Sequence, residues 1–347
     1  MPPASSYQDG NTARLYVHIA RDAPVGVVLR RGPSKQTLML KWDMTTETFE
    51  EGQWFIGRIY ERRCDLSPCG EHFAYFGAKH RPPFGAFTAI SPPPYYSAHI
   101  LWPKSDCWGG GGLFDAANET FELNHSTKWL KEKKEFAPNF AKGEAETAFG
   151  KLPPPYKAVA PHGEWSGCGE DLPIEHARMT RDGWNFKNKG LTATIPSNWE
   201  HIPAPDEGGI FFYWKTEGAI HWTKTARNGR TLTLIQDQAG QIDGRWNIIT
   251  CQLTTTKGTV VDFQRVDWAD FDKNDDLLYA RNGCLYRVKP GKEEAPHLII
   301  DLNNRTFKNV LAPKGMARHD RKRAKNNENE NAEDVPDSTG WHPLDDS

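Results

Sequence analysis

Short apolar runs alternate with polar turns along most of this chain, a pattern that predicts many short β-strands. The clearest unit is residues 266–288, where apolar runs at 277–280 and 284–288 flank the dipeptide Asn282-Gly283. A two-residue Asn-Gly connection between apolar segments is the strongest short-range signal of a β-hairpin. We therefore expect an antiparallel hairpin at this point.

Residues 64–78 repeat the first half of that unit. Asp65 and Asp267 each open a polar turn that leads into an apolar strand. Recurrence of one β unit at distant points of a chain is typical of a radial array of small sheets. The predicted fold class is therefore all-β, a β-propeller of five blades, with six blades as the alternative.

Further strand-length apolar runs extend over residues 14–312, and Gly, Pro, Asn and Asp separate them. The total of about 18–22 strands, at four strands per blade, favours five blades. The further candidates are residues 14–20, 25–31, 36–43, 53–60, 84–90, 95–102, 112–114, 121–123, 174–180, 184–186, 209–214, 220–225, 231–236, 246–253, 259–266, 297–302 and 307–311.

The rhythm of strands suggests how the chain is divided. Residues 1–13 are a loose lead-in, and residues 14–313 form the propeller domain. Residues 126–160 break the rhythm and are interpreted as an insertion between blades, partly helical because Ser126 or Thr127 can cap a short helix that reaches residue 135. Residues 314–347 are charged and almost free of large apolar side chains. Such a tail cannot bury enough surface to offset its ordering entropy, so we expect disorder there.

Composition narrows the class of protein. The formal net charge of −2 argues against a general nucleic-acid binder, which carries a strong basic excess. The six cysteines are scattered and do not resemble a disulfide framework. The first residues lack the basic start and apolar run of a signal peptide, and no apolar stretch approaches the length of a membrane helix. We therefore expect no membrane association and a cytoplasmic location.

Four segments carry a resemblance to a known group of proteins. Residues 24–31, 52–67, 100–114 and 267–288 resemble an uncharacterised bacterial β-propeller-like family. That family is similar to translocation-associated propellers and tryptophan–aspartate repeat proteins. The resemblance covers most of residues 14–312, apart from the insertion, and implies a propeller-like fold without supplying catalytic residues. Cys69 stands where the usual repeat turn has Asp, so only the backbone turn is implied at residues 67–70.

The segment around the glycine run 109–112 is the first candidate for a binding mouth. A phosphate-binding loop would need a following Lys-Ser/Thr and a helix, whereas Leu113-Phe114 follows here. Glycine at these positions instead favours a bulge or a close backbone approach. Aromatic side chains beside bare backbone suit a peptide or a ring-shaped ligand. The predicted binding residues are Trp102, Asp106, Trp108, Gly109 and Gly110, together with Trp184.

Two arginine pairs stand at the ends of strong strand runs, Arg30-Arg31 and Arg62-Arg63. Neighbours in a strand point to opposite faces, so one member of each pair is expected inside, paired with an aspartate. For Arg62 or Arg63 that partner is Asp65. The alternative is a cationic patch that faces a partner protein, and on that ground Arg62 and Arg63 join the predicted binding residues.

No catalytic or metal motif is complete. Ser166 lacks the two glycines of a nucleophile elbow. His162, Cys168 and His176 match no common zinc spacing. The acidic run at 267–276 lacks the turn glycine and final Glu of a calcium loop, so a solvated turn is expected there. We therefore predict no metal and no cofactor.

Paired carboxylates on the propeller axis are the remaining route to catalysis, because glycoside hydrolysis needs two of them across one pocket. The structural alternative is that each carboxylate caps its own turn. The candidates are Asp43, Asp65, Asp106, Asp182 and Asp267.

Two functions of different classes follow from these observations. The first is a non-enzymatic propeller that binds a protein or peptide partner, for example as an accessory or inhibitory subunit in a bacterial system. The alternative is a carbohydrate-active hydrolase or lyase that uses axial carboxylates. A nucleic-acid adaptor is the weakest hypothesis, because it rests only on the lysines of residues 128–134 and the basic start of the tail. The oligomeric state stays open.

Overall fold

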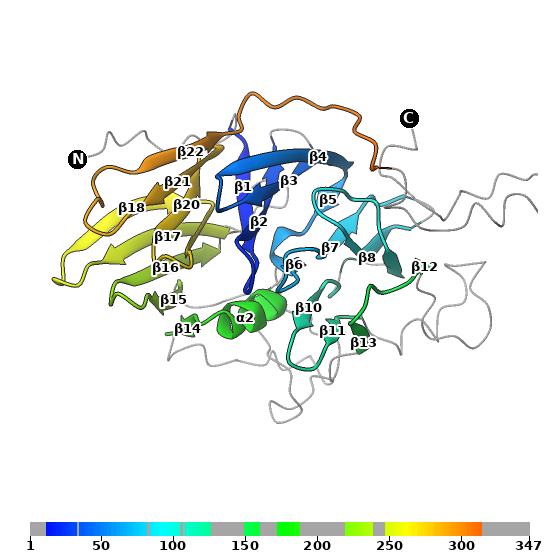
Figure 1. Cartoon of the computed structure of the whole chain (residues 1–347), viewed down its shortest axis with the longest axis horizontal. Helices are drawn as coiled ribbons and strands as arrows, with labels where there is room; N and C mark the ends of the chain where they lie inside the picture. The colour runs from blue at the N-terminus through cyan, green and yellow to red at the C-terminus, as the bar shows by residue number, and fades with distance from the viewer. Residues whose placement is uncertain are drawn as a thin grey trace, which may run out of the picture.

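The computed structural model is that of an all-β chain, as the sequence predicts (Figure 1). Its described residues form five β-sheets and one α-helix, α2 (Leu172–Arg181). All strand pairs among them are antiparallel except β11 with β13. The structure describes residues 12–32, 35–81, 84–104, 107, 109–125, 149–159, 172–187, 219–238 and 247–313.

Sheet A is a four-stranded meander in chain order. Its strands have an alternating or continuous apolar pattern, and their buried side chains pack on both faces. The strands are β1 (Arg14–Ile19), β2 (Val25–Arg31), β3 (Gln36–Asp43) and β4 (Thr48–Ile56).

Sheet E is a second four-stranded meander, and it contains the predicted hairpin. Arg281 pairs with Cys284 across the turn, and Asn282 and Gly283 both have positive φ, 53° and 74°. This is the backbone that a two-residue Asn-Gly turn adopts, so the hairpin is confirmed. The strands are β19 (Trp268–Phe271), β20 (Leu277–Arg281), β21 (Cys284–Val288) and β22 (His297–Asp301).

Sheet D is a five-stranded meander whose strands also pair in chain order. It packs against sheet E through one apolar cluster. The strands are β14 (Asn185–Phe186), β15 (Ile220–Thr225), β16 (Thr231–Gln238), β17 (Asn247–Thr254) and β18 (Val260–Val266).

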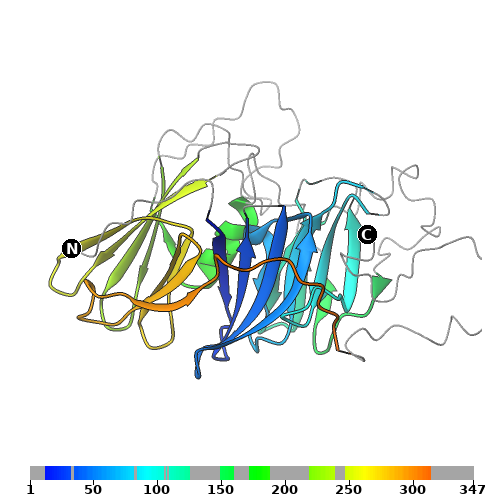
Figure 2. The same cartoon turned by 90° about the horizontal axis from the view of Figure 1, so that it is seen from above.

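Sheets B and C occupy the other side of sheet A, and Figure 2 shows sheet A between them and sheets D and E. Sheet B contains β5 (Arg58–Ile59), β6 (Asp65–Leu66), β7 (Phe73–Ala78), β8 (Ala86–Ser91), β9 (Ile100–Lys104) and β12 (Phe149–Gly150). A 3-10 turn, η1 (Glu61–Arg63), joins β5 to β6. Sheet C contains β10 (Gly112–Asp115), β11 (Thr120–Leu123) and β13 (Lys157–Val159).

Apolar clusters join successive sheets face to face. One cluster joins D to E, a second joins E to A, a third joins A to B and a fourth joins B to C. Large side chains such as Trp42, Phe55 and Phe114 are fully buried in these layers. The core is therefore a series of apolar layers between sheets, each formed by residues that the strand pattern places on facing sides.

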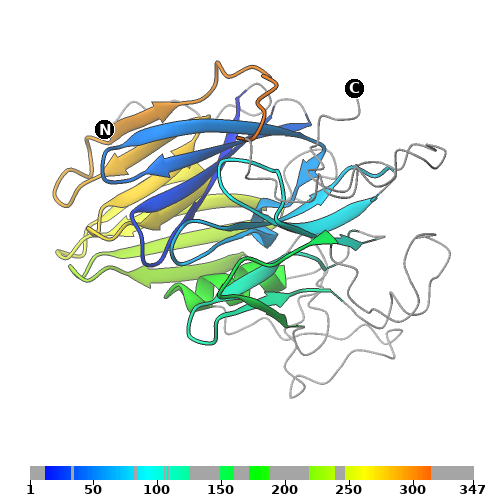
Figure 3. The same ribbon diagram turned by 45° about the vertical axis from the view of Figure 1, so that its right-hand side comes forward.

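Helix α2 lies between sheets C and D (Figure 3). The sequence pattern predicts a strand at 174–180, and that prediction is wrong because these residues belong to α2. Ile174, Glu175 and Arg178 are buried, which is the spacing of one helical face. The face was missed because two of its three buried residues are charged, so a search for apolar periodicity does not detect it.

The segment that follows β22 crosses the edge of sheet A (Figures 1 and 2). Arg30 donates to the carbonyls of Leu302 and Asn303, and Gln53 donates to the carbonyl of Val310. The strand predicted at 307–311 is therefore an irregular segment tied to sheet A by side chains. The helix predicted within residues 126–135, the strand at 209–214 and the tail at 314–347 lie outside the described residues.

Candidate functional site

A cavity of about 340 Å³ lies where β1, β6, α2, β15 and β19 come together. β1 contacts β6 and β19, and α2 contacts β10 and β14, so the first strands of several sheets meet there. Its lining is rich in charge and contains two indoles, those of Trp184 and Trp268. The charged residues of the lining are Arg21, Asp65, Glu175, Arg178, Asp182, Lys224, Arg227, Asp270, Asp272, Lys273 and Asp275.

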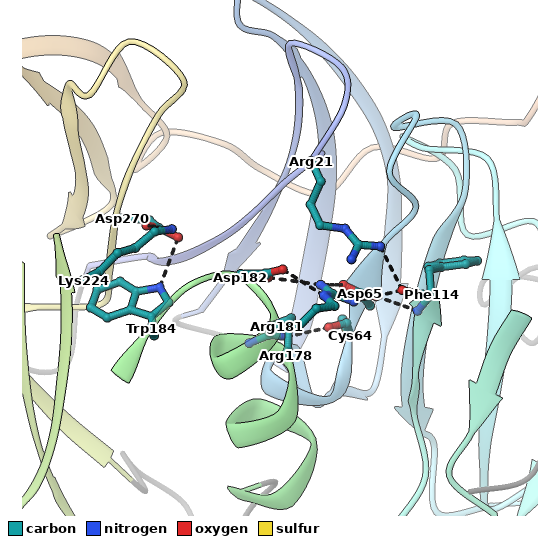
Figure 4. A network of polar contacts seen from close by, with 10 residues as sticks. All are labelled: Arg21, Cys64, Asp65, Phe114, Arg178, Arg181, Asp182, Trp184, Lys224 and Asp270. Atoms are coloured by element: carbon teal, nitrogen blue, oxygen red, sulfur yellow. Dashed lines mark hydrogen bonds and ion pairs between the residues drawn. The ribbon is translucent and has the colours of Figure 1, made fainter. Parts of the chain in front are cut away.

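The C-terminal end of α2 forms one wall of the cavity (Figure 4). Arg181 donates to both carboxylate oxygens of Asp65, at 2.7 and 2.9 Å, and to Asp182 at 2.8 Å. The backbone N–H of Phe114 also donates to Asp65, and Arg21 donates to the carbonyl of Phe114. These contacts join α2, β6, β10 and the end of β1 in one polar network.

A second, more deeply buried network lies beneath this wall. Arg62 forms an ion pair with Glu175 on α2, and both side chains are almost fully buried. Arg178 donates to the carbonyls of Arg62 and Cys64 and to the hydroxyl of Tyr16. Burial raises the pKa of Tyr16, so its hydroxyl stays protonated and accepts from Arg178.

His18 lines the cavity from β1 and is 5% exposed. Its Nε2 lies 3.1 Å from the carbonyl oxygen of Glu61, so this nitrogen carries the proton that is donated. Burial lowers the pKa of His18 well below its usual value, and the positive charge of Arg178 lowers it further. The imidazole is therefore neutral at physiological pH and adds no charge to the cavity.

Lys224, Asp270 and Trp184 form the opposite wall (Figure 4). Lys224 Nζ lies 2.7 Å from Asp270 Oδ1 and 5.6 Å from the centre of the Trp184 ring. The indole N–H of Trp184 donates to Asp270 at 3.4 Å. Lys224, Asp270 and Trp184 thus each contact the other two, which fixes a cation, a carboxylate and an aromatic face in one cluster. The lysine and aspartate side chains are partly exposed.

The acidic run at 267–276 provides the rim on this side. Asp272 and Asp276 are buried and both pair with Arg287, at 2.6 and 3.0 Å, and Asp275 pairs with Arg227. The prediction of a solvated turn is therefore wrong for Asp272 and Asp276, because their ion pairs with Arg287 on β21 compensate the burial of both carboxylates. No cluster of three or more His, Cys, Asp or Glu side chains in the described part of the chain is arranged to hold a metal ion.

Every carboxylate of the cavity lining has a cationic partner. Asp65 and Asp182 share Arg181, Glu175 binds Arg62, Asp270 binds Lys224, Asp272 binds Arg287 and Asp275 binds Arg227. Such a lining presents fixed dipoles and charges to a polar ligand without leaving a carboxylate free of partners.

Of the predicted site residues, Trp184 lies in this cavity. Trp102 is buried in sheet B and stacks on Phe121, with ring centres 5.8 Å apart. Gly109 and Gly110 are also buried, and a Cβ on Gly110 would lie 2.3 Å from the ring of Phe76. The described part of the predicted mouth is thus packed interior, and its glycine allows close approach of the backbone. Asp106 and Trp108 lie outside the described residues.

Arg62 and Arg63 form neither the predicted pair with Asp65 nor a surface patch. Both are buried, Arg62 against Glu175 and Arg63 against the carbonyls of Cys107 and Gly109. Asp65 binds Arg181 instead. The prediction paired residues close in sequence, whereas the ion-pair partners of Arg62 and Asp65 lie more than a hundred residues away along the chain.

Of the five candidate axial carboxylates, Asp65 and Asp182 converge on the cavity through Arg181. Asp43 accepts from the backbone of Thr45 and Thr46 in an exposed turn, as a turn cap does. Asp267 does not line the cavity, and Asp106 lies outside the described residues. Sequence reasoning missed Arg21, Arg178, Lys224 and Asp270 as members of one site. Each follows or belongs to a different element, and no spacing along the chain connects them.

Comparisons with known proteins add little to this geometry. No family model matches the chain, and no curated protein matches it. The crystal structure of an uncharacterised protein from Listeria monocytogenes aligns with 86% of this chain and 87% of its own, at 9% identity and a TM-score of 0.26. A TM-score this low supports no conclusion about fold or function, and the propeller-family resemblance stays a prediction. Among the described residues, no helix is long and apolar enough to cross a membrane.

Proposed function

We propose that the five sheets are blades of a β-propeller and that the chain is a non-enzymatic binding module. In this proposal a segment of a protein or peptide partner enters the central cavity. Three features support the ring: sheets A, D and E follow the chain as meanders, successive sheets pack face to face, and β1 of sheet A, β15 of sheet D and β19 of sheet E line one cavity. The segment 302–313, tied to sheet A, would close the ring.

The composition of the cavity is the observation that carries the binding function. Its volume of about 340 Å³ lies within the range of ligand pockets. Two indoles supply apolar contact, and the backbone and side chains of a peptide would find donors and acceptors on both walls. Because every carboxylate of the lining is already held by a cation, a ligand can bind without first ordering these carboxylates.

An accessory or inhibitory subunit of a bacterial system is a role that fits such a module, because it needs binding without catalysis. We place it in the cytoplasm. The five described cysteines are all free thiols, as expected in a reducing compartment.

The carbohydrate-active hydrolase or lyase is kept as the second candidate because Asp65 and Asp182 do converge on the cavity. It ranks below binding because both carboxylates bind the same guanidinium, that of Arg181. A glycosidase needs one carboxyl that donates a proton and another that acts as base or nucleophile. Release of reducing sugar from a polysaccharide panel, abolished by Asp182→Asn, would favour this candidate over binding.

The binding proposal is tested by selecting random twelve-residue peptides on phage with the full chain and measuring the affinity of the selected peptides by fluorescence anisotropy. Thr225 lines the cavity and is exposed, so Thr225→Trp narrows it without entering the core. Its cross-strand neighbour Thr231 does not line the cavity, and Thr231→Trp is the matched control.

We expect Thr225→Trp to weaken peptide binding by about tenfold or more, the effect of losing about 1.4 kcal/mol of contact. Thr231→Trp should stay within about twofold of wild type, which is the scatter of surface substitutions. Failure to enrich any peptide, or equal effects of the two variants, would overturn the proposal.

A further inference from the structure

Arg21 lines the cavity and, like Arg178 and Lys273, has no ion pair among the described residues. Its one hydrogen bond runs from Nη2 to the carbonyl of Phe114, at 2.9 Å. Its Nε is buried and has no hydrogen-bond partner. A guanidinium has five N–H donors in a fixed plane, so most of those of Arg21 are unused by the protein. Figure 4 shows its side chain reaching into the network from above.

Three guanidinium groups lie on the wall around Arg21. Arg178 also binds no carboxylate directly, since its partners are two backbone carbonyls and the Tyr16 hydroxyl. Arg181 binds Asp65 and Asp182. Arg21 and Arg178 are thus the two guanidinium groups of this wall that have no carboxylate in hydrogen-bond contact. The pKa of Asp115 is lowered, first by its hydrogen bond from Asn118 and also by the nearby charge of Arg21, but Asp115 forms no ion pair with Arg21.

We propose that Arg21 binds a carboxylate of the ligand that enters the cavity. This inference rests on the binding function proposed above and names the chemistry that the site recognises. A planar carboxylate matches the fork of a guanidinium. A doubly charged phosphate would be repelled more strongly than a carboxylate by Asp65 and Asp182.

The opposite wall does not compete for the same group. Lys224 already binds Asp270 at 2.7 Å, so the charge of Asp270 would repel a ligand carboxylate placed there. The faces of Trp184 and Trp268 instead offer apolar contact to the part of the ligand next to its carboxylate. The carboxylate of a peptide can come from its free C-terminus or from an Asp or Glu side chain, and both sources present the same chemistry to Arg21.

The test uses the tightest-binding peptide of the display experiment, synthesised in forms that separate the two sources. One form has a C-terminal amide in place of the acid, and another has Asn and Gln in place of Asp and Glu. The affinity of each form is measured for the full-length wild type, for Arg21→Gln and for Arg281→Gln. Arg281 is the matched control, because it also donates to one backbone carbonyl, that of Phe263, and does not line the cavity.

We expect one of the two neutralised forms to bind wild type about tenfold more weakly, the loss of one charge-assisted hydrogen bond, and that form identifies the source. The same neutralisation should cost less than about twofold in Arg21→Gln and the full tenfold in Arg281→Gln. Arg21→Lys keeps the charge without the fork; if Arg21→Gln does not fold, Arg21→Lys should bind the acid form more weakly than wild type does.

The outcomes separate this inference from the function on which it rests. If peptides bind and Thr225→Trp weakens them, but neutralisation costs the same in wild type and Arg21→Gln, the carboxylate inference is overturned and the binding function stands. If Arg21→Gln does not fold and Arg21→Lys binds the acid form as wild type does, the inference is likewise overturned. If no peptide binds, both fail.

Discussion

Arg181 of α2 and Asp65 of β6 form a two-point ion pair, with Nη1 2.7 Å from Oδ2 and Nη2 2.9 Å from Oδ1. Asp65 is 2% exposed, and its Oδ2 also accepts from the backbone N–H of Phe114. One buried carboxylate therefore joins a helix to strands of two sheets. Because α2 carries Glu175 and Arg178 into the cavity and Asp182 directly follows it, this pair helps to fix the shape of the site.

Asp65→Asn tests how strongly α2 depends on that pair. The substitution removes the negative charge and leaves a largely buried guanidinium facing an amide, which typically costs about 3 kcal/mol or more. We expect the midpoint of urea unfolding to fall accordingly, with α2 losing protection from hydrogen exchange before the sheets do.

Asp43→Asn is the matched control, since the same chemical change occurs at an exposed turn cap where Asn is an equally good acceptor. Its unfolding midpoint should stay close to that of wild type. Equal shifts of the unfolding midpoint in the two variants would mean that the ion pair of Asp65 with Arg181 does not stabilise the fold more than an exposed turn cap does.

The sequence was sufficient where structure depends on neighbours along the chain. The Asn282-Gly283 turn fixes both its own backbone and the register of β20 with β21, so the hairpin could be placed to the residue. The all-β class follows from many such local signals. Asp65, Asp182 and Trp184 were likewise singled out, because each lies in or beside a turn that leads into a strand.

The sequence was insufficient where structure depends on partners far away. Helix α2 buries Glu175 and Arg178, and only the presence of Arg62 and Tyr16 makes their burial favourable. The helix and strand propensities of residues 174–180 alone do not indicate that Glu175 and Arg178 are buried. In the same way Asp65 has two arginines within three residues and binds neither. It binds Arg181 instead, because α2 places that guanidinium where it donates to both carboxylate oxygens.

His18 gives the protein a predictable sensitivity to acid. Its folded-state pKa is lowered, by burial first and by Arg178 second, so below pH 6.5 the unfolded chain binds a proton that the folded protein does not. Stability from this group is present above pH 6.5 and falls by about 1.4 kcal/mol for each unit below it. His18→Gln keeps a donor for the Glu61 carbonyl and removes the titration.

We therefore expect the free energy of unfolding of His18→Gln to fall less than that of wild type between pH 7 and pH 5. Chemical denaturation at both values measures the difference, which should reach about 2 kcal/mol. His297→Gln, at an exposed position on β22, should keep the wild-type dependence. A parallel fall in His18→Gln and wild type would contradict the prediction.

Gly110 is predicted to tolerate no side chain. Its φ is +83°, and an added Cβ would meet the ring of Phe76, which is fully buried and has no space to move. Gly258 has almost the same φ, +80°, with nothing within 4 Å of the added Cβ. Gly258→Ala should cost about 1 kcal/mol for the backbone alone, and Gly110→Ala should cost that amount plus about 1–3 kcal/mol for overpacking. Thermal unfolding of Gly110→Ala and Gly258→Ala measures the difference. Equal losses of stability in the two variants would show that the ring of Phe76 moves to make room for the added Cβ.

Gln53 holds the segment 302–313 against sheet A through one side-chain amide. Its oxygen accepts from the backbone N–H of Tyr96 and Ser97, and its nitrogen donates to the carbonyl of Val310 at 3.0 Å. Gln53→Glu keeps an acceptor for the two N–H groups but sets a carboxylate oxygen against the carbonyl of Val310. Two acceptors that face each other in a buried position lose the hydrogen bond and repel, at a cost of about 1–3 kcal/mol.

The expected result is local release of this segment, while the sheets stay folded. Trypsin cuts after Arg305 and Lys308, and cleavage of a transiently opened segment follows its open population. We expect these two cuts to be about tenfold faster or more in Gln53→Glu, as mass spectrometry of a time course would show. Gln252→Glu, a partly exposed position on β17, makes the same chemical change away from this segment and should leave both rates at the wild-type value. Unchanged cleavage in Gln53→Glu would mean that Arg30, Asn303 and Arg305 hold the segment without the amide.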